Sequence, residues 1–279
     1  MIRISFADQY SDLFMVHIQE LLESGVHFGH RVTRWNPRMA PFIFGARNGI
    51  HIIDLIQTLQ YLNETSSFLK DFVSRAHRNS GKIKHVLLVG TKKQASSLVE
   101  QMAQTINQEK NAQSDSSPIH IHYVNYRWLG GLLTNWDTMK LCIDQYNDLL
   151  VRESSGELQT LPKKEQAVFR KQSEKLQKFF GGMHTMTERP SLVIIIGQDI
   201  EMNAVRECQK IQSILELQDS RIQSTIALKA ADSKFRTITL LDTNCDPSLA
   251  DLFVPANDDS TKSIACILTA WTAALQTHA

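Results

Sequence analysis

Basic and aromatic side chains crowd the segment Gly25–Gly49, and no acidic residue interrupts the chain between Glu23 and Asp54. Guanidinium groups bind phosphate oxygens through paired hydrogen bonds, and aromatic rings stack on unpaired bases. A loop that offers both, with no carboxylate to neutralise it, is typical of an RNA-binding surface. The predicted phosphate contacts are Arg31, Arg34, Arg38 and Arg47, and Trp35 is a candidate for an RNA-facing ring.

The aromatic residues of this segment also fit a structural role. Phe28 and Phe42 are expected to pack beneath a long N-terminal loop. Trp35 fits a core position as well as an RNA-facing one, and the same two interpretations stay open for Trp128.

A second acid-free basic run lies between Asp71 and Glu100, around the apolar stretch His85–Val89. In the motif HVLLVGTKKQ, a strand is followed by glycine, two lysines and a helix. In a doubly wound sheet this order places the lysines at the carboxyl edge beside a helix N-terminus, where anions bind. The predicted phosphate contacts of this run are Arg75, Arg78, Lys82, Lys92 and Lys93.

An enzyme would bind a phosphorylated ligand at the same edge, so an α/β enzyme is the alternative interpretation. Neither G-x-G-x-x-G nor G-x-x-x-x-G-K-[ST] follows a predicted strand. Asp242, Asn244 and Asp246 follow the last strand, where they fit turns and caps better than a metal or ribose site. His27 and His30 lack a suitably spaced third ligand, so no metal or other cofactor is expected.

Four short apolar runs rich in β-branched residues predict the strands that would position these groups. They are His85–Val89, Ile119–Val124, Leu192–Ile196 and Thr237–Leu241. Apolar residues at helical spacing predict helices in Asp54–Val73, Gln94–Ile106, Ile200–Leu217 and Ser260–Leu275. Strands that alternate with helices indicate an α/β fold, in which helices cover both faces of a parallel sheet.

The alternation stops between Asp137 and Phe180, where the sequence predicts two helices joined by a turn at Gly156–Pro162. The apolar stripe is Met139, Ile143, Tyr146 and Leu150, then Val168, Leu176, Phe179 and Phe180. A stripe this narrow favours an antiparallel coiled-coil hairpin. Its lysines form either a contact with RNA or protein, or a solvated face.

Glycine and asparagine punctuate the root of this hairpin. Gly130 and Gly131 are expected to allow close backbone approach where the sheet leads into the hairpin. Asn135 and Asp137 are expected to cap the first helix on either side of Trp136.

Composition sets limits on the class of protein. Lys+Arg is 30 and Asp+Glu is 29 among 279 residues, so total charge does not support nucleic-acid binding and only its distribution does. The four cysteines are scattered, which argues against a zinc ribbon or a disulfide framework. No apolar run predicts a membrane span, and the segment Met1–Glu23 resembles neither a signal nor a transit peptide. The chain is therefore expected to act in the compartment where it is made.

The chain is expected to comprise an N-terminal lead (1–23), the first part of an α/β domain (24–136), the hairpin (137–182) and the second part of the domain (183–279). The polar stretch Asn107–Pro118 reads as a loop, and Leu217–Phe235 is ambiguous.

The chain resembles the bacterial-type small-subunit ribosomal protein S-two family. The matching segments, in order, are Gly25–Met39, Gly49–Leu55, Val89–Lys93, Tyr123–Trp136, Gly181–Met186, Leu240–Pro247 and Val254–Asp259. Residues taken as structural in these motifs are Gly25, Gly29, Asn36, Pro37, Gly130, Gly131, Asn135, Trp136, Asp242, Asn244 and Asp246.

The resemblance implies a flavodoxin-like or Rossmann-like α/β domain with an inserted coiled-coil hairpin. It implies a structural constituent of the ribosome that sits on small-subunit rRNA at the junction of head and body, with no cofactor and no reaction. Other small-subunit proteins, and in bacteria an S-one-type protein, are the implied partners.

The sequence departs from the family pattern at Asn107–Pro118, around Leu217–Phe235 and in the lead Met1–Val16. The phrases DTNCDP and PANDD resemble plastid and cyanobacterial members. A plastid (chloroplast) stroma is the expected location, with the bacterial cytoplasm or a mitochondrion as alternatives.

Overall fold

A five-stranded parallel sheet forms the centre of the molecule. The computed structural model describes residues 17–78, 84–112, 119–156, 162–221 and 235–276. The strands are β4 (Lys84–Val89), β5 (Ile119–Val124), β6 (Leu192–Ile196), β7 (Arg236–Leu241) and β8 (Leu252–Pro255), in the order β5-β4-β6-β7-β8. The four predicted strands and the α/β fold class are confirmed. The fifth strand, β8, was not predicted.

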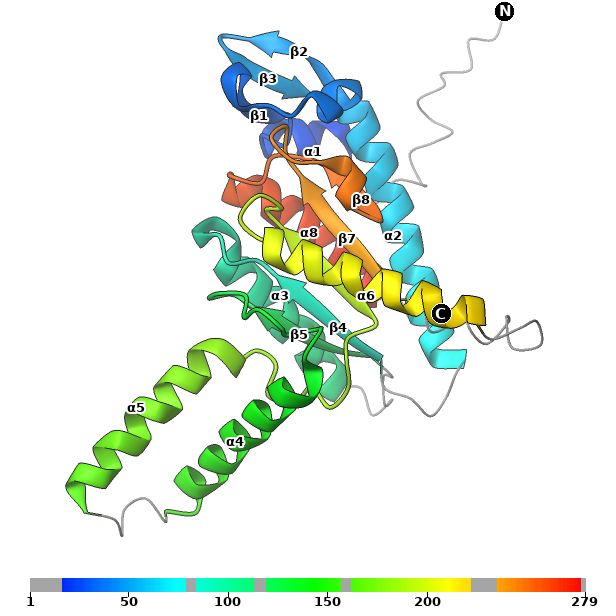
Figure 1. The fold of residues 1–279 in the computed structure, drawn as a ribbon. Helices are drawn as coiled ribbons and strands as arrows, with labels where there is room; N and C mark the ends of the chain where they lie inside the picture. Colours follow the sequence, from blue (N-terminus) through cyan, green and yellow to red (C-terminus); the bar gives the residue numbers. More distant parts are fainter. Residues whose placement is uncertain (1–16, 79–83, 113–118, 157–161, 222–234, 277–279) are drawn as a thin grey trace, which may run out of the picture.

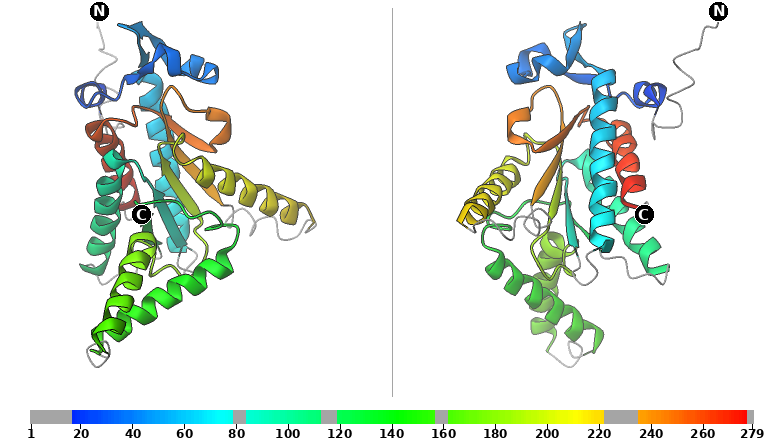
Figure 2. Two further views of the ribbon diagram at one scale, coloured as in Figure 1. Left: turned by 60° about the vertical axis from the view of Figure 1, so that its left-hand side comes forward. Right: turned by 90° about the vertical axis from the view of Figure 1, so that its right-hand side faces the viewer.

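Helices cover both faces of this sheet (Figure 2). The helices α2 (Leu55–Arg78), α3 (Lys93–Ala112) and α8 (Thr261–Gln276) pack on one face, against Val86 and Leu88 of β4. The helix α6 (Met202–Arg221) packs on the other face, against Leu87 and Val89. Successive residues of one strand thus enter opposite cores, as a buried parallel strand requires. None of the described helices is long and apolar enough to cross a membrane.

The N-terminal region is a second sheet and not the predicted loop. The strands β1 (Phe28–Arg31), β2 (Ile43–Arg47) and β3 (Ile50–Ile53) form an antiparallel sheet in the order β1-β3-β2. Asn48 and Gly49 join β2 to β3 with φ angles of 53° and 75°. Two successive positive φ angles make the hairpin turn that the Asn-Gly pair favours. The helix α1 (Ile18–Glu23) and the short 3-10 helices η1 (Val32–Arg34) and η2 (Pro37–Phe42) flank this sheet.

The predicted insertion contains two helices, α4 (Trp136–Ser154) and α5 (Lys163–Phe180), which project from the sheet side by side (Figure 1). Their pairing as an antiparallel coiled coil stays a prediction. The predicted stripe is wrong at Val168, which is 64% exposed. The less exposed positions of α5 are Gln166, Phe169, Ser173, Leu176, Phe179 and Phe180.

The Glu207 carboxylate on α6 holds the loop that leads into α4. It accepts hydrogen bonds from Trp128 Nε1 at 3.3 Å, from the Gly131 N–H at 2.6 Å and from the Leu133 N–H at 3.1 Å. Trp128 is buried, which supports its structural interpretation. Gly131 has φ +89°, whereas a Cβ on Gly130 would meet nothing within 4 Å, so the expected close approach is wrong for Gly130.

Asn135 occupies the N-cap position of α4, as predicted, but its side chain makes no capping bond to the backbone. Its Oδ1 instead accepts the Thr138 hydroxyl at 2.8 Å. Asp137 lies in the first turn, where a carboxylate interacts favourably with the helix dipole.

The outer edge of β5 is closed by other parts of the chain. The Asn107 side chain donates to Ile121 O at 2.8 Å and accepts from its N–H at 3.3 Å, and the Tyr123 N–H donates to Gly182 O at 3.0 Å. A Cβ on Gly182 would lie 2.3 Å from Tyr123 O, so only glycine fits there. Because α3 continues to Ala112, the loop predicted for Asn107–Pro118 is wrong for residues 107–112.

Two buried histidines connect β4 and β5. His85 Nδ1 lies 2.8 Å from His122 Nε2, and His85 Nε2 lies 3.1 Å from the Thr187 hydroxyl. Burial, together with the neighbouring histidines, lowers the pKa of His122 to about 3, and burial likewise lowers the pKa of His85. Both imidazoles are therefore neutral in the folded protein at neutral pH.

Stability should fall as the pH drops from about 6.5 towards 3, because the unfolded chain takes up a proton at His122 and the folded chain does not. One such group contributes at most about 1.4 kcal/mol per pH unit. Urea unfolding of His122→Gln should show a weaker dependence on pH than the wild type. The matched variant His77→Gln, at an exposed position of α2, should keep the wild-type dependence. Equal pH profiles for all three proteins would contradict the assignment.

Candidate functional site

Thr243, directly after β7, holds the small sheet on the carboxyl edge of the large one. Its Oγ1 accepts the His30 N–H at 2.9 Å, and its carbonyl accepts the Asn36 N–H at 2.8 Å. A Cβ on Gly29 would lie 2.5 Å from Thr243 Cγ2. Gly29 therefore permits the close approach of β1 to this edge.

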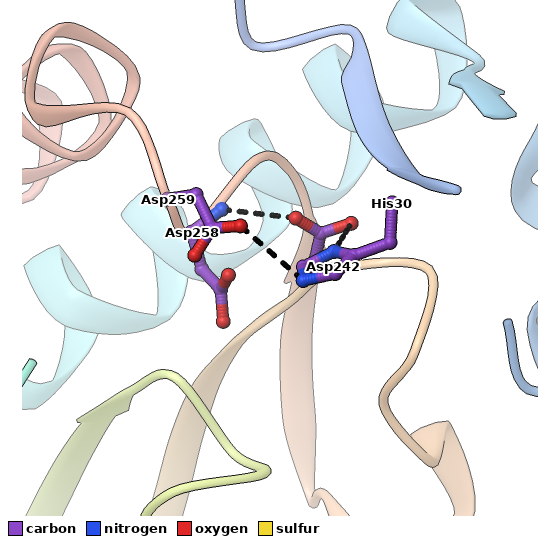
Figure 3. Close-up of side chains that lie close together, drawn as sticks. All are labelled: His30, Asp242, Asp258 and Asp259. Carbon is purple, nitrogen blue, oxygen red and sulfur yellow. Dashed lines mark hydrogen bonds and ion pairs between the residues drawn. The ribbon is translucent and has the colours of Figure 1, made fainter. Parts of the chain in front are cut away.

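A cluster of charged side chains lies at the same contact (Figure 3). His30 Nδ1 lies 3.1 Å from Asp242 Oδ1, and His30 Nε2 lies 3.2 Å from Asp259 Oδ2. Lys92 Nζ, directly before α3, lies 2.6 Å from Asp258 Oδ1 and 3.1 Å from Asp259 Oδ1. Residues from β1, from the start of α3 and from the segments after β7 and β8 thus meet in one network, the edge cluster.

Burial and charge set the protonation of the edge cluster. The hydrogen bond to Asp242 raises the pKa of His30, although burial opposes it. Burial also disfavours the Lys92 cation, but the Asp258 and Asp259 carboxylates outweigh that and raise the pKa of Lys92. Burial and the charge of Asp242 raise the pKa of Asp258, against the attraction of Lys92. The carboxylates are therefore held by cations of the chain itself.

The donor atoms of His30, Asp242, Asp258 and Asp259 all lie within 4.8 Å of one another. Imidazole and carboxylate groups are ligands for divalent cations, so these four residues could hold one. Lys92 already brings positive charge to two of them. Sequence spacing did not reveal this cluster, because its carboxylates lie more than 200 residues after His30.

The prediction that Lys92 contacts phosphate disagrees with this geometry, because its side chain is buried in ion pairs. The backbone beside it is also occupied. The Thr91 N–H donates to the buried Glu201 carboxylate at 2.9 Å, and burial raises the pKa of Glu201. The place at this strand edge where an anionic ligand was expected to bind is thus occupied by carboxylates of the chain itself. Lys93, the next residue, is exposed.

The described residues line a cavity of about 250 Å³ that lies elsewhere, between α3, the edge of β5 and the residues after α5. The acids of the edge cluster do not line this cavity.

The arginines of the first basic segment differ in whether they form an ion pair. Arg31, Arg34 and Arg47 are exposed, and among the described residues none of them forms an ion pair. Arg38 is also exposed, but its Nη1 lies 2.5 Å from Asp246 Oδ2 and 2.7 Å from Ser248 Oγ. Arg38 therefore links the two sheets.

Aromatic residues accompany these arginines on the small sheet. Trp35 is 38% exposed and lies 5.2 Å from the His51 ring, between centroids. Phe28 is 48% exposed, contrary to the core position expected for it, and Phe44 is 80% exposed. Phe42 packs edge-on against Tyr61 and Phe253, as expected of a core residue.

The second basic segment is divided, because Lys92 and Lys93 lie at the edge cluster and its arginines lie elsewhere. Arg75 and Arg78 lie in the last turn of α2, which begins next to the small sheet and spans about 36 Å over its 24 residues. Arg75 lies 3.8 Å from Asp71, and Arg78 donates to Ser74 O at 3.4 Å. Lys82 lies outside the described residues. Arg75 and Arg78 are therefore separated from the small sheet.

Several residues taken as structural have visible roles. Gly25, just after α1, has φ +71°. Asn36 accepts the Arg38 N–H at 3.0 Å beside Pro37, which opens η2. Asp246 accepts the Ser248 N–H at 3.0 Å at the start of the 3-10 helix η5 (Pro247–Leu249), as expected of a cap. Asn244 donates to Asp199 at 3.2 Å, and Trp136 is buried at the start of α4.

Known proteins are similar in sequence to this chain over most of its length. A family model described as Ribosomal protein S2 matches residues 21–217 and 213–277. The chain is 46% identical over 254 residues to "Small ribosomal subunit protein uS2c" of Oltmannsiellopsis viridis, covering 91% of this chain and 89% of that protein. It is 41% identical to "Small ribosomal subunit protein uS2" of Nostoc punctiforme, covering 91% and 80%, and 42% identical to that of a Picosynechococcus species, covering 91% and 83%.

Two adjacent lysines offer a matched test of the edge cluster. Lys92→Met should lower the free energy of unfolding by about 3–5 kcal/mol, because it leaves the buried carboxylate of Asp258 unpaired. Lys93→Met, at the exposed neighbour, should change it by less than about 0.5 kcal/mol. Urea denaturation at neutral pH measures both, and a similar cost for the two substitutions would rule out a buried pairing of Lys92.

Proposed function

The chain belongs to the ribosomal protein S2 family, and from this premise we propose that it docks on small-subunit rRNA through the outer surface of the β1–β3 sheet. Its role is that of a structural constituent of the small ribosomal subunit, and not that of an enzyme. Membership of the family rests on sequence similarity along nearly the whole chain. The docking surface rests on the exposed side chains and the contacts of the small sheet.

The main support for this docking surface is that three exposed arginines lie on a segment without acidic residues. Arg31, Arg34 and Arg47 lie between Glu23 and Asp54, the nearest acidic residues in the chain. A guanidinium group with no protein carboxylate to pair with keeps its full attraction for phosphate. The exposed rings of Trp35 and Phe44 add surfaces on which unpaired bases can stack.

Rigid support favours this surface over a flexible basic tail. The edge cluster and Thr243 fix β1 to the large sheet, and the Arg38 pair with Asp246 fixes η2. Because the arginines belong to docked elements, binding orders few new residues and loses less conformational entropy. Lys93 and the exposed side of Arg38 are proposed as additional contacts.

The remaining basic residues are proposed as a separate contact. Arg75 and Arg78, with Lys82, would meet phosphates at the far end of α2, away from the small sheet. Other small-subunit proteins are proposed neighbours, and an S-one-type protein is a further proposed partner. The chloroplast relative uS2c and the cyanobacterial relatives support a plastid stroma as the proposed location.

The test is binding of the purified protein to transcribed small-subunit rRNA across a salt series. Each phosphate contact adds about 0.7–0.9 to the slope of log affinity against log salt. The triple variant Arg31→Gln, Arg34→Gln and Arg47→Gln should lower that slope by about 2–3. The control removes three exposed arginines from elsewhere, Arg152, Arg189 and Arg206, and should keep most of the slope. Equal losses in both variants would mean that binding follows net charge and not this surface.

A further inference from the structure

Helices α4 and α5 form an arm that projects away from the large sheet (Figure 1). Trp136, the first residue of α4, and Phe180, the last residue of α5, are buried in a core that also contains Leu87 of β4. Val151 and Val168, further along the arm, are each 64% exposed. The direction of this helical arm is therefore set at its root.

The length of the arm makes the geometry of the root decisive. α4 has 19 residues and a length of roughly 28 Å. A turn of about 10° at the root would move the far end of the helix by about 5 Å. Hydrogen bonds need donor and acceptor atoms at about 3 Å, so a displacement of that size breaks any contact made by the far end.

The Glu207 carboxylate on α6 fixes the loop that leads into the arm. Its Oε1 accepts the Gly131 N–H at 2.6 Å and the Trp128 Nε1–H at 3.3 Å. Its Oε2 accepts the Leu133 N–H at 3.1 Å, three residues before Trp136. Trp128 and Leu133 are buried, so water does not readily replace the carboxylate as their acceptor.

A carboxylate suits this place better than any neutral side chain of the same size. Both of its oxygens accept hydrogen bonds and it has no donor of its own, whereas a Gln amide would turn an NH₂ group towards one of the N–H donors. Bonds to a charged acceptor are about twice as strong as those between neutral groups. No ion pair between described residues includes Glu207, so these three N–H groups are its bonding partners.

The return side of the arm is fixed by the backbone. The Tyr123 N–H of β5 donates to Gly182 O at 3.0 Å, two residues after α5 ends. No side chain takes part in this bond. Glu207 is therefore the residue through which a single substitution can loosen the root.

We propose that Glu207 is a positioning residue that presets the direction of the helical arm before the chain enters the small subunit. The proposal rests on the role of the chain as a small-subunit constituent, and not on the docking surface of the β1–β3 sheet. A protein whose binding-competent conformation is populated only part of the time binds with an affinity reduced by that fraction. A preset arm avoids this loss.

The experiment measures the direction of the arm by pulsed electron spin resonance on the full chain. Spin labels are attached at Lys171→Cys of α5 and Thr269→Cys of α8, two exposed positions, after the half-buried Cys142 and Cys266 are changed to Ser. The chain with Glu207 should give one narrow distance distribution. Glu207→Gln should broaden it, and Glu207→Ala should broaden it more, because Ala leaves all three donors without their acceptor.

The matched control is Glu174→Ala, which removes an exposed acid from α5 and should keep the narrow distribution. Each variant is also titrated against small subunits that lack this protein. Glu207→Ala should bind at least about tenfold more weakly than the wild type, and Glu174→Ala equally well. Hydrogen exchange of the β4 amides, which should not change, checks that the central sheet stays folded.

Three results would overturn the proposal. The first is a narrow distribution in Glu207→Ala. The second is a broadened distribution with unchanged affinity, because the small subunit then makes no use of a preset direction. The third is a loss of β4 protection in both Glu207 variants, which would make Glu207 a residue of the whole fold. The Arg31, Arg34 and Arg47 variant should keep the narrow distribution, so a failure of the proposed docking surface is distinguishable from a failure of Glu207.

Discussion

Three carboxylates meet where β7 and β8 end, and at neutral pH they need positive charge close by. Asp242 and Asp258 are buried, and a buried acid without a partner would strongly destabilise the fold. Lys92, directly before α3, pairs with Asp258, and His30 of β1 pairs with Asp242. The His30 contact that helps to neutralise these acids therefore also fixes the small sheet, which carries the exposed Arg31 and Arg47, on the large one.

The large sheet could be predicted because its strands are continuous apolar runs, whereas the edge cluster could not. Asp258 and Asp259 follow β8, a four-residue strand that ends in Pro255 and has only a weak pattern. Lys92 and Lys93 look equivalent in the sequence, yet one is buried and the other exposed. Only the tertiary contact of Lys92 with Asp258 and Asp259, after β8, separates their roles. The Asn48-Gly49 pair was a local signal for the β2–β3 hairpin.

Helix α5 shows how far the spacing of apolar residues in the sequence predicts the less exposed side of a helix. Only Val168 leaves the predicted stripe, and Phe169, about 100° further around the helix, is less exposed in its place. Leu176, Phe179 and Phe180 stay on the less exposed side. Exposed arginines lie on the small sheet, although the formal net charge of the chain is only +1. The case for RNA binding rests on where the positive charges lie and not on the net charge.

The most direct measurement of the central claim is a cryo-EM map of a small ribosomal subunit that contains this chain. The account predicts rRNA phosphates within ion-pair distance of the guanidinium groups of Arg31, Arg34 and Arg47, with Lys92 still buried against Asp258. A map in which the outer surface of the β1–β3 sheet faces solvent or another protein, with no phosphate near these arginines, would contradict it.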